Sequence, residues 1–140
     1  MNEDEFLDCV FEGDIEAVKK VIVENDRPGV NFVCHKLNAT PLIIAVDSGF
    51  PAMVELFLMN GANPDFTRPG LSLPLYHAIE LAEEAADYQG TDDSGLLEII
   101  RLLMEYGANA NALNYNETSP VDYAAHRYPP ALKIINNYVK

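Results

Sequence analysis

The stretch TPLIIAVDSGFPAMVELFLMNGANPD, residues 40–65, contains two short helices and the turns that bound them. Thr40 is a preferred N-cap residue, and Pro41 suits the first helical turn because its φ is fixed and the N–H that it lacks would have no partner there. Apolar residues then recur three and four positions apart until Gly49, which predicts the end of the first helix. The dense apolar residues at 53–58 predict a second, more deeply buried helix.

The same unit recurs 33 residues later and then once more. Proline opens the later copies at Pro74 and Pro120, and an alanine follows each proline four residues on. The ending Gly61-Ala62-Asn63 recurs as Gly107-Ala108-Asn109, and residues 12–25 match the second half of the unit. Such self-similarity is typical of repeat proteins, in which each unit buries its apolar face against its neighbours.

The pattern resembles the ankyrin repeat, and the resemblance covers essentially the whole chain. The family signature Thr-Pro-Leu-His-x-Ala corresponds to residues 40–45, 73–78 and 119–124, and the closing Gly-Ala-x-x-Asn to residues 61–65 and 107–111. The resemblance implies an all-α ankyrin-repeat solenoid of stacked helix-turn-helix units with hairpin-like loops, capped at both ends. We expect a single domain over residues 1–140, with repeats at about 3–35, 36–68, 69–114 and 115–140 and an insertion near 82–95.

The chain departs from the family pattern at its turns. The histidine of the signature is absent, and the residues in its place are Ile43, Tyr76 and Asp122. We therefore expect the hydrogen bonding between adjacent repeats to be weaker or different. The turn glycine before the signature is replaced by Asn38, which tolerates a positive φ, and by Leu71 and Glu117, which tolerate it poorly. We expect irregular loops at these last two positions.

The third unit carries 13 residues more than the second between its opening proline and its closing glycine. Apolar residues keep a helical spacing past the usual end of the first helix, so we expect this helix to reach about Tyr88 and to stop at Gly90. The next helix is expected from Leu96, with Asp93 or Ser94 as its N-cap. The insertion is thus a lengthened helix followed by a loop.

The insertion is strongly acidic. Seven of the 22 acidic residues lie within residues 80–98, which contain no Lys or Arg, so this segment supplies more than half of the net charge of −13. Two interpretations stay open: a solvated helix face on a tolerated insertion, or a recognition element for a basic partner protein. The spacing of the acids does not follow the Asp-x-Asp-x-Asp-Gly pattern of a calcium loop, and we expect no metal.

Composition argues against several classes of function. A net charge of −13 opposes binding to nucleic-acid backbones and to anionic membrane surfaces. The acidic start MNEDEF is unlike a signal peptide, so we expect a cytoplasmic protein. The two cysteines lack a metal-binding spacing, the three histidines fall in different repeats, and no phosphate loop or nucleophile motif is present. We therefore expect neither an enzyme nor a cofactor.

In ankyrin-like proteins a concave surface, lined by loop tips and first helices, binds other proteins, and the resemblance implies the same here. We expect a free-standing module, monomeric when free, that acts by occupying a protein partner. Its acidity favours an immunity- or inhibitor-type protein that masks a basic partner such as a toxin, and the alternative is an adaptor or complex subunit that recruits its partner without inhibiting it. The candidate partner-binding residues are Lys36, Leu37, Asp47, Ser48, Glu80, Glu83, Glu84, Asp87, Asp92, Asp93, Tyr115, Asn116, His126 and Arg127.

Overall fold

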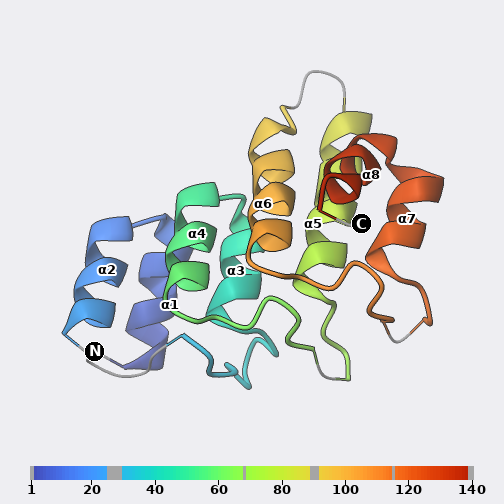
Figure 1. Cartoon of the computed structure of the whole chain (residues 1–140). Helices are drawn as coiled ribbons and strands as arrows, with labels where there is room; N and C mark the ends of the chain where they lie inside the picture. The colour runs from blue at the N-terminus through green and yellow to red at the C-terminus, as the bar shows by residue number, and fades with distance from the viewer. Residues whose placement is uncertain (1, 25–29, 68, 89–91, 115, 139–140) are drawn as a thin grey trace.

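The computed structural model describes residues 2–24, 30–67, 69–88, 92–114 and 116–138. Within these ranges the chain forms helices arranged as four consecutive pairs, which stand side by side from the amino-terminal to the carboxy-terminal end (Figure 1). The helices are α1 (Glu3–Glu12), α2 (Ile15–Val23), α3 (Pro41–Ser48), α4 (Pro51–Met59), α5 (Pro74–Asp87), α6 (Ser94–Glu105), α7 (Pro120–Arg127) and α8 (Pro129–Asn136). The all-α solenoid predicted from the sequence is confirmed.

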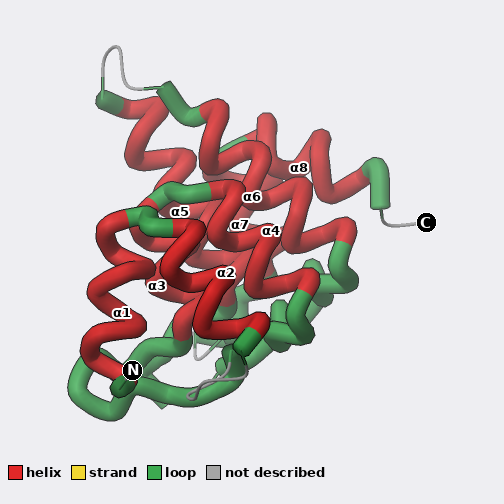
Figure 2. The backbone as a smooth tube through the Cα atoms, turned by 90° about the vertical axis from the view of Figure 1, so that its left-hand side faces the viewer, coloured by secondary structure: helices red, strands yellow, loops and turns green. Residues whose placement is uncertain are grey.

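The pairs stack in two layers. The first helices α1, α3, α5 and α7 contact one another in order, and so do the second helices α2, α4, α6 and α8. Figure 2 views this stack along its length, with the loops between repeats gathered at one end of the helices. The core lies between and within the layers, and its fully buried side chains include Phe6, Phe57, Ile79, Leu103 and Ile135.

The helix ends follow the chemistry of the repeated motif. Thr40 Oγ1 accepts a hydrogen bond from the backbone N–H of Ile43 at 3.2 Å, and Ser119 Oγ accepts one from the N–H of Asp122 at 3.2 Å, so both residues are N-caps. Gly49 ends α3 in the left-handed conformation, with φ of 72°. The start and the end of the first helix of the repeat unit are therefore as the sequence predicts.

The loops between repeats show how the chain manages without the family's turn glycine. The loop 34–39 closes with an antiparallel bridge between its end residues, and Asn38 takes a φ of 49°. Glu117 takes a φ of 58° at the equivalent place in the last loop, although it is not a glycine. In the loop between them Gly70 supplies the positive φ, at 83°, and the next residue, Leu71, is buried instead.

Polar side chains join each closing motif to the next one. The side-chain amide of Asn31 donates to the carbonyl oxygen of Gly61 at 2.9 Å and accepts from the backbone N–H of Asn63 at 2.9 Å. One repeat further on, Asp65 Oδ1 accepts from the backbone N–H of Asn109 at 2.8 Å. Asn31 and Asp65 thus each fix the closing motif of the following repeat by satisfying one of its backbone donors.

Candidate functional site

The first helices and the loops between repeats form one face of the molecule, which we call the first-helix face. Three grooves follow one another along it. We call them the amino-terminal groove, beside α1, the central groove, between α3 and α5, and the carboxy-terminal groove, between α5 and α7. Their volumes are about 340, 380 and 550 Å³, respectively.

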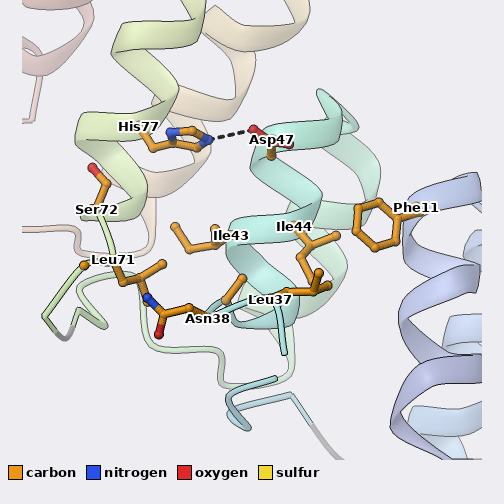
Figure 3. Close-up of a pocket in the computed structure, with 11 residues that line it drawn as sticks. Phe11, Leu37, Asn38, Ile43, Ile44, Asp47, Leu71, Ser72 and His77 are labelled. Carbon is orange, nitrogen blue, oxygen red and sulfur yellow. Dashed lines mark hydrogen bonds and ion pairs between the residues drawn. The ribbon is translucent and has the colours of Figure 1, made fainter. Parts of the chain in front are cut away.

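The central groove is mostly apolar. Its walls include Phe11 and Leu37, whose residues are 47% and 46% exposed, and the well-buried Ile43, Ile44 and Leu71 (Figure 3). Exposed Phe and Leu side chains beside a hollow are typical of a surface that a partner covers. This apolar surface arises because Ile43 and Ile44, near the start of α3, line the groove.

A polar bridge crosses the central groove at its helix side. His77 Nε2 on α5 and Asp47 Oδ1 on α3 are 2.9 Å apart (Figure 3). This bridge joins adjacent repeats, and it comes from the residue after Tyr76, which stands in place of the signature histidine. The side chain of Asp47 stays 57% exposed, and its second carboxylate oxygen is therefore open to a ligand.

The amino-terminal groove shares two walls with the central groove, Phe11 and Leu37. It adds Asp4 and Asp8 from α1 and Lys36 from the loop. Residues four positions apart lie on the same side of a helix, so the two carboxylates repel each other. Among the residues that the structure describes, neither acid has an ion-pair partner.

The carboxy-terminal groove is aromatic. The rings of Tyr76 and Tyr123 are 4.7 Å apart and inclined by 47°, and the guanidinium of Arg127 lies 5.9 Å from the centre of the Tyr123 ring. Both contacts are favourable for aromatic rings. The Nδ1–H of His126 donates to the carbonyl oxygen of Asp122 at 2.8 Å, which holds the imidazole against its own helix.

The acidic insertion is not a uniformly exposed ridge, and Glu83 corrects that expectation. Its side chain is only 10% exposed and accepts hydrogen bonds from the Tyr123 hydroxyl and from Arg127 Nε, the latter at 3.0 Å. Burial, and then the hydrogen bond to Glu83, raises the pKa of Tyr123. Two extra turns of α5 bring this carboxylate against α7, so it holds the last repeat instead of facing solvent.

Asp93 is also engaged within the molecule, because it accepts a hydrogen bond from the hydroxyl of the buried Tyr128, which lies between α7 and α8. The predicted start of α6 is corrected as well: the helix begins at Ser94, two residues early. Asp93, one of the two predicted N-caps, does occupy the N-cap position, but its side chain makes no capping hydrogen bond. Asp92 instead accepts from the backbone N–H and the hydroxyl of Ser94, each at 2.9 Å, and these bonds lower the pKa of Asp92. We call the Glu83 and Asp93 contacts the carboxy-terminal clamp.

The remaining acids of the insertion differ in exposure. Glu84 and Asp87 are exposed at the end of α5, which ends where the sequence predicts, at Tyr88 as C-cap. Glu80 is half-buried, and its pKa is raised mainly by burial. The predicted stop at Gly90 lies outside the described residues. Among the described residues, the acidic surface that the insertion offers to a partner is therefore carried mainly by the exposed Glu84, Asp87 and Asp92.

Apart from the acids of the insertion, the predicted partner-binding residues fall into three groups. Those that line the grooves are Lys36, Leu37, Asp47, His126 and Arg127. Asn116 is exposed next to the carboxy-terminal groove, whereas the half-buried Ser48 at the end of α3 lines none of the three. Tyr115 lies outside the described residues. Their role in binding stays a prediction.

Sequence reasoning missed the groove residues Phe11, Ile43, Ile44, Leu71 and His77. For Phe11 a signal was present: it stands two residues before the helix-ending Gly13, as Asp47 stands two residues before Gly49. Extending the register of the second repeat to the first would have placed it on the same face. For Ile43, Ile44 and Leu71 no such signal exists, because an apolar residue gives no sign of lying at the edge of a groove, and the partner of His77 lies 30 residues away in the sequence.

Potential metal ligands are dispersed in the described parts of the chain, where no three His, Cys, Asp or Glu side chains gather so that they could hold a metal ion. None of the described helices has the length and apolar character needed to cross a membrane.

The comparisons with known proteins agree with this architecture. A family model of the ankyrin repeat matches residues 38–68. The sequence is 31% identical, over 109 residues and 77% of this chain, to an ankyrin repeat and KH domain-containing protein of Caenorhabditis briggsae, of which it spans only 4%. The structure matches the ankyrin repeat domain of Bcl-3, a member of the IκB protein family, with a TM-score of 0.75 and 25% identity, covering 94% of this chain and 50% of that one. Ankyrin repeats indicate a protein–protein interaction module, and the matches in sequence and structure together support an ankyrin-repeat protein.

Proposed function

We propose that this chain binds a basic partner protein through its first-helix face and masks that partner's functional surface, as an inhibitor or immunity-type protein does. The observation that carries the proposal is the combination of apolar surface and carboxylates in the three grooves. The acids that line them are Asp4, Asp8, Asp47, Glu117 and Asp122. Apolar contact area supplies affinity, while carboxylates around it select a partner of opposite charge.

The charge of the whole chain supports the same choice of partner. A net charge of −13 attracts a basic protein over long distances and accelerates its association. The exposed Glu84 and Asp87 extend the negative surface beyond the grooves, whereas Glu83 and Asp93 are occupied by the carboxy-terminal clamp. We therefore assign the insertion a minor role in capture, through long-range attraction.

We further propose that the free chain is a cytoplasmic monomer that performs no catalysis. Its like charges oppose association with a second copy. The dispersal of its histidines and cysteines, together with a fold whose family serves as an interaction scaffold, supports action by binding alone.

Affinity capture followed by an activity assay tests the proposal. The immobilised chain is exposed to lysate at low and at high salt, and the captured protein is purified and assayed with and without one equivalent of the chain. We expect a basic protein that is released by salt and loses activity in the complex. Full activity in the complex would support the adaptor alternative instead. A partner whose binding ignores salt would contradict the electrostatic basis of both.

A pair of charge variants locates the electrostatic contribution. Neutralising Glu84 and Asp87 should slow association moderately and flatten its salt dependence. The control removes two charges from the second-helix layer, by Glu16→Gln and Glu55→Gln, where both residues are exposed. Equal effects of the two variants would show that only net charge matters, and that the insertion has no local role.

A further inference from the structure

We infer that the central groove anchors one segment of the partner: an apolar side chain enters the groove, and a Lys or Arg a few residues away contacts Asp4 and Asp8. The inference rests on the proposed protein-binding function and names the chemistry of the segment that this face takes. Four observations on the described residues carry it.

The first observation is the shape and lining of the groove. Its volume of about 380 Å³ suits one or two side chains, being near the lower end of the roughly 300–1,000 Å³ of ligand pockets. Phe11 and Leu37 form a wall that is nearly half exposed, and Ile43 and Ile44 lie behind it (Figure 3). A polar or charged side chain placed against this apolar wall would lose its hydration without gaining partners there, so an apolar one is favoured.

The second observation is the polar edge. Asp47 is held in place by His77 at 2.9 Å, yet its side chain is 57% exposed. Its free carboxylate oxygen can accept a backbone N–H of the segment that carries the apolar side chain. An acceptor that is already fixed loses little conformational entropy when the segment binds.

The third observation is the uncompensated charge next to the groove. Asp4 and Asp8 lie one turn apart on α1 and repel each other. Lys36 lines the same groove but forms no ion pair with either acid in the part of the chain that the structure describes. A cation from the partner would relieve this repulsion, whereas an acidic residue would increase it.

The fourth observation is continuity. Phe11 and Leu37 line both grooves, so a segment that fills the central groove passes directly beside the two acids. An extended chain advances about 3.3 Å per residue, so a cation about two to four residues from the apolar anchor reaches roughly 7–13 Å along the segment, and we expect it in this range. The recognised pattern is thus an apolar residue with a Lys or Arg close by in the same segment.

Selection from a random peptide library displayed on phage, with the whole chain as bait, tests this pattern. We expect the enriched peptides to share an apolar residue and a Lys or Arg about two to four positions away. Synthetic copies of an enriched peptide are then titrated by fluorescence anisotropy against variants of the chain. Leu37→Ser should weaken binding about tenfold, as expected for an anchor contact. The control Met59→Ser, which removes a 64% exposed side chain of α4, should leave binding unchanged.

A separate double variant tests the Lys or Arg of the recognised segment. Combined Asp4→Asn and Asp8→Asn should weaken binding and reduce its salt dependence, whereas combined Glu16→Gln and Glu24→Gln on α2 should not. Circular dichroism and a urea midpoint for each variant show that the fold is kept. All substituted residues are exposed except the wall residue Leu37, which is nearly half exposed.

Four outcomes would overturn the inference: no enrichment, an acidic or uncharged consensus, equal binding by Leu37→Ser and wild type, or self-association of the free chain that Leu37→Ser abolishes, which would assign the groove to a second copy. Its failure is distinguishable from failure of the proposed function. If Leu37→Ser captures and inhibits the partner as well as the wild type does, the anchor site is refuted and the inhibitor function stands. If capture needs Leu37 but the partner stays active in the complex, the inhibitor function is refuted and the anchor site stands.

Discussion

Replacing Glu83 by Gln should destabilise the protein, although residue 83 belongs to an acidic surface helix that tolerates changes elsewhere. The carboxylate accepts from two donors on α7, the Tyr123 hydroxyl and the guanidinium of Arg127. An amide has only one oxygen acceptor, and its NH₂ group would face one of these donors. One donor would therefore lose its partner, and the contact between α5 and α7 would weaken.

The magnitude follows from the contacts. Hydrogen bonds to charged groups contribute about 1.5–3 kcal/mol. The ion pair adds little, at most about 1 kcal/mol, because the side chain of Arg127 is 61% exposed. Removing a charge from a site where the side chain is 10% exposed recovers part of its desolvation cost. We expect a net loss of about 2 kcal/mol in the free energy of unfolding.

Urea unfolding followed by circular dichroism measures this loss. With a slope of about 2 kcal/mol per molar urea, the midpoint should fall by roughly 1 M. The matched control is Glu84→Gln, the next residue of the same helix, which is exposed and should stay within about 0.5 kcal/mol of wild type. Tyr123→Phe and the double variant complete a cycle, which should give a coupling energy of about 1–2 kcal/mol. Equal midpoints for the two Gln variants would refute the clamp.

Three further predictions concern backbone strain and burial. Glu117→Gly should raise the free energy of unfolding by about 0.5–1 kcal/mol, because φ of 58° is strained for a side chain; a lower urea midpoint would contradict this. Gly49→Ala should lower the free energy of unfolding by about 1 kcal/mol, because the φ at this position is 72°. Gly13→Ala, at a similar φ of 73°, should lower it by about 1 kcal/mol more, because its Cβ would lie 3.0 Å from the Phe50 ring. Equal thermal midpoints of the two variants would show that the ring moves aside freely. Burial raises the pKa of Glu80 above 4.5, so its protonated form stabilises the fold below that pH and this stability is lost as the pH rises through the folded-state pKa. Glu80→Gln should therefore be more stable than wild type at pH 7 and equal to it at about pH 3, and a constant difference across a pH series of urea midpoints would count against this.

The fold was predictable because its signals repeat. Thr40 and Ser119 each precede a proline and an apolar helix, so the N-cap prediction at one position supports the prediction at the other. Both residues cap their helices as predicted. The lengthening of α5 could also be predicted, because the helical spacing of its apolar residues continues towards the end of the helix at Asp87. Local signals of this kind depend on neighbours in the sequence.

The contacts of the insertion were not predictable, because they depend on residues far away in the chain. Glu83 meets Tyr123 across 40 positions and Asp93 meets Tyr128 across 35, so neither partner could be identified from the residues around these acids. The run of acids suggested one exposed surface. Consecutive residues of a helix point about 100° apart, however, so Glu83 and the adjacent Glu84 lie on different sides. A helical projection of α5 beside α7 would have been needed to see the difference.

The carboxy-terminal clamp makes the two ends of the stack unequal under mechanical load. Over the described residues α8 packs on α6 much more extensively than α2 packs on α4, and Glu83 and Asp93 tie the last pair down further. A force applied between the ends should therefore peel α1 and α2 away first and release α7 and α8 late. Because Phe11 on α1 and Leu37 border the central groove, the anchor site would be dismantled at the first of these steps. A partner that pulls on this protein would loosen its own anchor before it unravels the rest.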